Sequence, residues 1–151
     1  MLKIYVDADS CPVKDEVIRV AKRHDLEVFI VSNSYLRLNA GAKVQMIVVK
    51  AKFDEADNWI AERIEENDIA ITADILLADK CCKKNAGVIG PNGKMFSSDN
   101  IGMKVAMRDL NSHLRDTGEI SSHNASFTKQ DRSRFLETLE NTIQRIRRKD
   151  S

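Results

Sequence analysis

Two aspartates stand at the end of a short apolar segment near the start of the chain. Asp7 directly follows residues 2–6, which are typical of a first strand, and Asp9 comes two residues later. Side chains of an extended segment alternate with a period of two, so both carboxylates can face the same way, about 6.5 to 7 Å apart. Such a pair can share a hydrated divalent cation. The alternative is structural: one aspartate caps the next helix and the other is solvated in a turn, where Asp is common.

Two further aspartates fall where the chain is expected to turn between a strand and a helix. Asp74 follows residues 69–72, an apolar run typical of a central parallel strand that is covered on both faces. Asp57 lies at helical spacing from Ile60, so we expect its side chain to point toward the sheet. A carboxylate directed inward needs a partner. Alternatively, with Asp54 as N-cap, Asp57 occupies a first-turn position where acids help to cap a helix.

Carboxylates that gather repel one another, and they stay ionised only when cations neutralise them. No spacing of His or Cys resembles a zinc site, so the ligands would be oxygen atoms, which Mg²⁺ and Mn²⁺ prefer. Two such ions about 3.5 to 4 Å apart can activate water and stabilise the leaving oxygen in phosphodiester hydrolysis. The pattern predicts a Mg²⁺ or Mn²⁺ site with Asp7, Asp9, Asp57 and Asp74 as ligands and with Asp7, Asp9 and Asp74 as catalytic residues.

Basic residues are expected to bind the phosphates of a substrate. Lys14, Arg37 and Arg132 are the candidates, and the planar fork of arginine matches phosphate geometry. For Arg108 an ion pair with a surface acid is the better interpretation. Aromatic side chains that could stack on bases are few, and Tyr35 alone lies in an evident loop.

The hydrophobic pattern alternates between strands and helices along most of the chain. We expect strands at residues 2–6, 27–31, 44–49, 69–72, 88–89 and 94–96. We expect helices at about 12–24, from 54, at 75–85, from 101 to near Gly118 and at 128–149. Gly87 is expected to end the third helix in a left-handed conformation. Residues 90–93, Gly-Pro-Asn-Gly, predict a turn, and Thr128 is expected to cap the last helix.

This alternation predicts an α/β fold, a three-layer sandwich with a mostly parallel central sheet. The strand-to-helix loops of such a sheet gather at one edge, so acids far apart in the sequence can converge there. A length of 151 residues suits one domain, residues 1–151, that ends in a basic helix.

The composition is that of an ordinary soluble protein, with 42% hydrophobic and 31% charged residues. A net charge of +1 argues against a strongly cationic nucleic-acid coat protein, although it allows a locally basic groove. We expect no signal peptide and no membrane span. Cys81 and Cys82 are neighbours and indicate no disulfide framework, which favours the cytoplasm. Cys11 could be a nucleophile or soft metal ligand, but a small buried thiol is the commoner situation.

Five segments carry a resemblance that spans nearly the whole chain. They are Val6-Asp7-Ala8-Asp9-Ser10-Cys11-Pro12, residues 54–60, Ile71-Thr72-Ala73-Asp74-Ile75, residues 106–110 and Asp131-Arg132. Together they look like the YaiI/YqxD family of uncharacterised bacterial proteins. That family resembles PIN-like nuclease domains, which are metal-dependent ribonucleases with acidic residues at the edge of a parallel sheet.

The resemblance implies a PIN-like fold that acts on nucleic acid, expected to be single-stranded RNA, and it implies a homodimer. It supports Asp7 and Asp74 as the acids after the first and fourth strands, with Asp9 and Asp57 as additional ligands. Asp79 stands where the family often has alanine, so we expect it to be a solvated surface residue. Asp99 is another, weaker candidate, and residues 121–127 depart from the Gly/Pro-rich stretch that relatives usually show.

Two other functions fit the same residues. Asp7-Ala8-Asp9 after a first strand also resembles the start of a haloacid-dehalogenase phosphatase, with Asp7 as nucleophile and Asp9 as acid/base. A convincing intervening Lys and the usual cap insertion are missing for that enzyme. The third alternative is a non-catalytic module that binds RNA or a protein. We expect the metal-dependent nuclease.

Overall fold

A single sheet forms the centre of the molecule. The computed structural model describes residues 2–9, 11–35, 43–50, 55–97, 101 and 127–150. In these ranges the strands are β1 (Lys3–Asp7), β2 (Glu27–Ser32), β3 (Val44–Val48), β4 (Ile69–Ile71), β5 (Gly87–Ile89) and β6 (Met95–Phe96). Their order is β3-β2-β1-β4-β5-β6, and all neighbours are parallel except β5 and β6.

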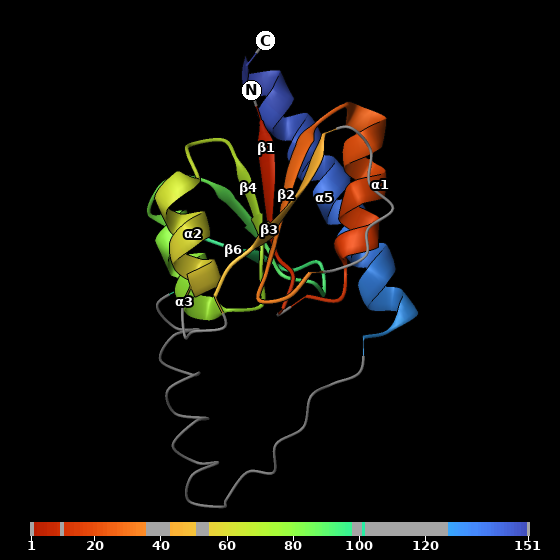
Figure 1. Cartoon of the computed structure of the whole chain (residues 1–151). Helices are drawn as coiled ribbons and strands as arrows, with labels where there is room; N and C mark the ends of the chain where they lie inside the picture. Colours follow the sequence, from red (N-terminus) through yellow and green to blue (C-terminus); the bar gives the residue numbers. More distant parts are fainter. Residues whose placement is uncertain are drawn as a thin grey trace, which may run out of the picture.

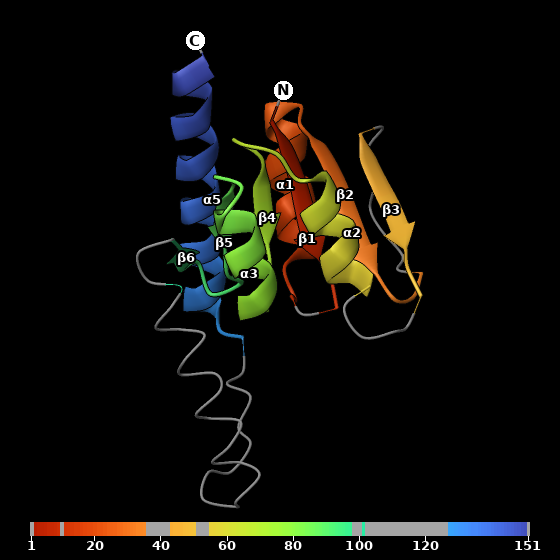
Figure 2. The same cartoon turned by 90° about the vertical axis from the view of Figure 1, so that its left-hand side faces the viewer.

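Helices cover both faces of the sheet, so the predicted three-layer α/β sandwich is confirmed (Figure 1). Helices α1 (Lys14–His24) and α5 (Lys129–Asp150) lie on one face, and α2 (Glu55–Arg63) and α3 (Ile75–Cys82) lie on the other (Figure 2). Side chains of β1 alternate between the two cores: Ile4 packs beneath α1 and α5, and Tyr5 packs beneath α2 and α3.

The order of the strands reverses direction at β1. From β1 the chain moves outward to β2 and β3, and it then returns to the other side of β1 to form β4 and β5. Helix α1 follows β1 on one face of the sheet, whereas α3 follows β4 on the opposite face. The carboxyl ends of β1 and β4 therefore border the crevice in which open α/β sheets bind their ligands.

The predicted end of α3 is wrong in one respect. Gly87 does not end this helix but begins β5, where it pairs with Ile69. The residue with positive φ after α3 is Asn85, at 62°, and Asn is one of the few residues besides Gly that tolerate this conformation. Gly87 instead lies close to α5, since a Cβ there would be 3.4 Å from Cγ2 of Thr142.

The start of α5 has the capping that the sequence predicts. The backbone N–H of Asp131 donates to Oγ1 of Thr128 at 3.0 Å, and the N–H of Thr128 donates to Oδ2 of Asp131 at 3.1 Å. These reciprocal bonds satisfy amides that a helix start leaves without partners. Phe135 and Leu139 then bury the first half of α5 against the sheet.

The helix predicted from residue 101 to near Gly118 lies outside the described residues, apart from Ile101. No helix in the described ranges is both long enough and apolar enough to cross a membrane.

Candidate active site

Asp7 is a buried acid at the carboxyl end of β1, with only 5% of its surface exposed. It lies beside β4, because the register of the two strands pairs Val6 with Ile71. The hydroxyl of Thr72, the residue after β4, donates to Oδ2 of Asp7 at 3.0 Å. The most buried of the catalytic candidates thus stands where the strand order reverses.

Asp9 is exposed and turns toward β2. Strand β1 ends at Asp7, and Ala8 and Asp9 form a turn, so the alternation of an extended strand does not continue to Asp9. Oδ1 of Asp9 accepts from the hydroxyl of Ser32, and Oδ2 accepts from the backbone N–H of Asn33, both at 2.7 Å. The two acids therefore accept hydrogen bonds from residues at the ends of opposite neighbours of β1.

Asp74 lies at the same edge and caps α3. Its backbone is extended, and Oδ1 accepts from the N–H groups of Leu76 at 2.9 Å and Leu77 at 3.4 Å. Its own N–H donates to Oγ1 of Thr72 at 2.9 Å, so Thr72 lies between Asp7 and Asp74. Part of the Asp74 carboxylate thus has a structural task, and the side chain remains half-buried beside the candidate site.

Asp57 points inward from the first turn of α2, as its spacing from Ile60 predicts, with 5% of its surface exposed. Its charge acts on Cys81 of α3. Burial, then the neighbouring Cys82, raises the pKa of Cys81 to about 12, and Asp57 contributes to the rise. Asp57 therefore faces the interior between α2 and α3. Cys11 is buried too, as expected for a small core thiol.

The described residues contain no group of three or more His, Cys, Asp or Glu side chains that could hold one metal ion. The ligand set of four aspartates therefore stays a prediction. The donors at the edge are carboxylate and hydroxyl oxygens, which suit a hard ion. Mg²⁺ commonly binds through only one or two carboxylates and completes its shell with water and substrate phosphate. The residues present fit that mode of binding.

Helices α1 and α5 both begin at the edge of the sheet where β1 ends (Figure 1), and their first turns contain Lys14 and Arg132. Nζ of Lys14 lies 3.5 Å from Oδ2 of Asp15. Nε of Arg132 lies 3.1 Å from Oε1 of Glu16, which is nearly buried. Lys14 and Arg132 thus both have acidic neighbours, and the third phosphate-binding candidate, Arg37, lies outside the described residues.

Other residues named from the sequence lie away from this arrangement or beyond what the structure describes. Asp79 forms an ion pair with Lys83 one helical turn away, at 3.1 Å, as expected for a surface acid. Arg108 and Asp99 are outside the described residues.

Sequence reasoning did not predict three of the contacts at the site. Thr72 and Ser32 hold the two acids of the β1 end, and Glu16 holds Arg132. A signal for Glu16 exists: it lies three residues after Val13 and four before Val20, on the apolar stripe of α1. For the two hydroxyl residues the signal is their place, since each comes at the end of a strand that borders β1.

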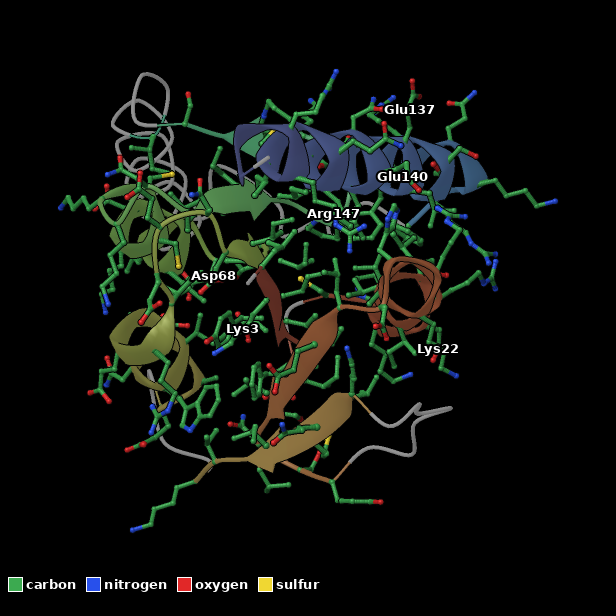
Figure 3. The ribbon with its side chains drawn as sticks, turned by 90° about the horizontal axis from the view of Figure 1, so that it is seen from above. Lys3, Lys22, Asp68, Glu137, Glu140 and Arg147 are labelled. Carbon is green, nitrogen blue, oxygen red and sulfur yellow. The ribbon has the colours of Figure 1, made fainter. Side chains whose placement is uncertain are left out.

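Charged groups at the opposite edge of the sheet stabilise the fold (Figure 3). Asp68 accepts from the backbone N–H groups of Lys3 at 3.1 Å and Glu65 at 3.0 Å, and burial raises the pKa of Asp68. Glu140 of α5 lies 2.6 Å from Nε2 of His24. These contacts fasten β1 to β4 and α5 to α1.

A cavity of about 420 Å³ also lies at this opposite edge, between α3, β6 and α5. Asn85, Phe96 and Arg145 are among its lining residues. None of the four candidate aspartates lines it, so the cavity and the acidic edge are separate features.

Comparisons with known proteins give a consistent picture. A model of a family described as uncharacterised, the YaiI/YqxD family, matches residues 5–145. A UPF0178 protein of Agrobacterium fabrum is 55% identical over 146 residues, which are 97% of this chain and 95% of that protein. A UPF0178 protein of Parvibaculum lavamentivorans is 52% identical over 149 residues, 99% of this chain and 98% of that protein. No solved structure matches the chain.

Proposed function

Because the chain belongs to the YaiI/YqxD family, whose description names no activity, we propose a function from the geometry of the site. The protein is a Mg²⁺- or Mn²⁺-dependent nuclease that hydrolyses phosphodiester bonds in single-stranded RNA. The observation that carries this proposal is Asp7, an acid with 5% exposure at the carboxyl end of the central strand, where the order of the strands reverses. Asp9 and Asp74 stand at the same edge.

A divalent cation suits this edge for electrostatic reasons. Burying a carboxylate is unfavourable unless hydrogen bonds or an opposite charge compensate for it. Thr72 donates to Asp7, and Asp9 and Asp74 stand at the same edge, where a cation would offset the repulsion between these carboxylates. Bound to Asp7 and Asp9, such an ion would make water a better nucleophile and stabilise the leaving oxygen of a phosphodiester.

The chain's own groups orient a nucleic-acid backbone. Helices α1 and α5 both begin at this edge, and helix starts favour anions such as phosphate. Lys14 and Arg132 lie in their first turns and add positive charge. A phosphate bound at this edge would therefore lie on the side of the sheet where two helices begin, each with a basic side chain in its first turn.

The preference for a single strand is supported by Tyr35. Its side chain is 78% exposed, and it follows the residues of the β2 end that hold Asp9. An exposed aromatic ring offers a surface on which an unpaired base can stack. The other aromatic rings near β1, Phe29 and Trp59 among them, pack against Tyr5. The homodimer implied by the family resemblance and the cytoplasmic location favoured by the cysteines remain predictions.

The test is cleavage of end-labelled single-stranded RNA by the purified protein in Mg²⁺, in Mn²⁺ and in chelator. Asp7→Asn removes the charge at the centre of the site. Asp79→Asn is the matched control, because Asp79 lies on the surface of α3 with Lys83 as its partner. We expect cleavage that needs metal and that Asp79→Asn retains. Asp7→Asn should lower it by at least about 100-fold, since replacing even a residue behind a metal ligand typically costs 10- to 100-fold.

Other outcomes would favour the alternatives. Cleavage that persists unchanged in Asp7→Asn would contradict the nuclease. An acid-labile phosphoryl adduct on Asp7 would support the aspartate-nucleophile phosphatase. Binding of RNA without turnover in either metal would support the non-catalytic module.

A further inference from the structure

Two buried hydroxyl groups stand on either side of Asp7 and Asp9. Ser32 is the last residue of β2, and Thr72 directly follows β4, so each ends a strand that borders β1. Both side chains are fully buried. The acids of the β1 end therefore lie between two hydroxyl residues, one on each side.

Each hydroxyl makes the same two hydrogen bonds. Oγ1 of Thr72 accepts from the N–H of Asp74 at 2.9 Å and donates to Oδ2 of Asp7 at 3.0 Å. Oγ of Ser32 accepts from the N–H of Ser34 at 3.2 Å and donates to Oδ1 of Asp9 at 2.7 Å. In both places the amide belongs to the second residue after the hydroxyl, and the carboxylate belongs to β1 or its turn.

The hydrogen bond from the backbone N–H fixes the direction in which each hydroxyl donates. A hydroxyl has one hydrogen and two lone pairs, and an N–H can be received only by a lone pair. The single hydrogen of Thr72 is therefore directed at Asp7, and that of Ser32 at Asp9. Each carboxylate thus meets a donor whose position the adjoining strand sets.

A purely structural role explains only half of this arrangement. Ser and Thr often accept from the amide two residues ahead when they close a turn. Such a turn needs the lone pair of the hydroxyl but makes no use of its hydrogen. Here one hydrogen goes to Asp7 of the central strand and the other to Asp9 of the turn that follows it, and both acids are among the four that the sequence singles out.

We propose that Thr72 and Ser32 are the positioning residues of the acidic edge: Thr72 sets the orientation of Asp7 and its separation from Asp74, and Ser32 sets the orientation of Asp9. The proposal rests on the cation site of the proposed function. Neither hydroxyl is a metal ligand in this arrangement. Each acts on a cation through the carboxylate that it holds, as residues behind metal ligands do.

The test is the affinity of the full-length protein for Mn²⁺, without substrate, from the electron paramagnetic resonance signal of the free ion. Thr72→Val removes the hydroxyl and keeps the shape, whereas Thr72→Ser keeps the hydroxyl. Thr142→Val is the matched control, since Thr142 is a buried threonine of α5 whose hydroxyl donates to the carbonyl of Thr138. We expect Thr72→Val to weaken Mn²⁺ binding by about 10- to 100-fold, while Thr72→Ser and Thr142→Val stay close to wild type.

Ser32→Ala provides an independent arm on the other side of β1, and Ser34→Ala, which removes an exposed hydroxyl of the same loop, is its control. Thermal unfolding checks that each variant is folded. If Thr72→Val does not fold, Ser32→Ala decides the test, and it should weaken Mn²⁺ binding by a factor in the same range of about 10 to 100.

Unchanged Mn²⁺ affinity in folded Thr72→Val and Ser32→Ala would overturn the proposal, and so would a wild-type protein that binds no Mn²⁺. The proposed function can fail separately. If the wild type binds Mn²⁺ but cuts no RNA, the nuclease is wrong, and the affinities of the variants still decide the roles of Thr72 and Ser32. If the wild type cuts RNA and the hydroxyl variants bind Mn²⁺ normally, only the positioning roles fail.

Discussion

The turn between β5 and β6 holds the start of α5 against the sheet, and Gly93→Ala should disrupt it. Gly93 has a φ of 84°, a conformation that L side chains rarely adopt. A Cβ at this position would lie 2.6 Å from the carbonyl carbon of Arg134 and 2.7 Å from the nitrogen of Phe135. The hydroxyl of Thr138 also donates to the carbonyl of Gly93 at 2.8 Å. The added methyl group would therefore push against the backbone of α5, which cannot move away as a flexible side chain could.

The size of the effect follows from two contributions. Placing a residue other than glycine in a left-handed conformation lowers the free energy of unfolding by about 1 to 2 kcal/mol. Overpacking against fixed atoms adds about 1 to 3 kcal/mol. We therefore expect Gly93→Ala to lower the free energy of unfolding by about 2 to 5 kcal/mol, the sum of the two. For a chain of this size that corresponds to a fall of roughly 4 to 20 °C in Tm.

Urea denaturation of the wild type and the variant measures this difference. Gly87→Ala is the control, because its methyl group would be 3.4 Å from a side-chain atom of Thr142 and Gly87 has no positive φ. A loss for Gly93→Ala no larger than that for Gly87→Ala would refute the reasoning. It would mean that the turn is not fixed against α5.

Three further predictions concern charges and thiols. Burial alone would raise the pKa of Glu140, but hydrogen bonds from Gln144, Arg23 and His24 outweigh it and hold the pKa below its ordinary value of 4.5. This stabilisation is present above pH 4.5 and is lost as the pH falls through the lower pKa of the folded state. Glu140→Gln should therefore flatten the pH dependence of the free energy of unfolding below pH 4.5, as measured by urea denaturation. Arg132→Gln should destabilise the fold by about 1 to 3 kcal/mol because it leaves nearly buried Glu16 without its cation, and adding Glu16→Gln should recover part of the loss in the same assay. Cys81 should resist iodoacetamide at pH 8 until the protein is unfolded, because burial raises its pKa to about 12, and mass spectrometry would detect any native labelling that contradicts this.

Local patterns in the sequence predicted the fold well because they act over a few residues. The inward position of Asp57 follows from its helical spacing to Ile60 and is confirmed by its burial. The capping of α5 by Thr128 also depends only on neighbours in sequence, and it is confirmed. The end of α3 was harder to predict, because Asn85 and Gly87 both tolerate positive φ and only the pairing of Gly87 with β4 separates their roles.

The arrangement of the candidate site depends on contacts between distant segments. The bond from Thr72 to Asp7 joins residues 65 positions apart and requires the register of β1 against β4. The direction of Asp9 depends on the end of β1 at Asp7, which a pattern of alternating residues does not locate to a single position. The sequence could therefore name the acids, but it could not predict which hydroxyl groups hold them.

The most direct test of the central claim is the single-turnover rate of RNA cleavage in Mn²⁺ by Asp7→Asn, compared with the wild type at saturating protein. The carboxylate of Asp7 is the buried acid on which the site is built. If it holds the catalytic cation, the rate should fall by at least about 100-fold, the upper end of what replacing a residue behind a metal ligand costs. The affinity for single-stranded RNA, measured in chelator, should stay near that of the wild type. An equal rate in Asp7→Asn would contradict the account.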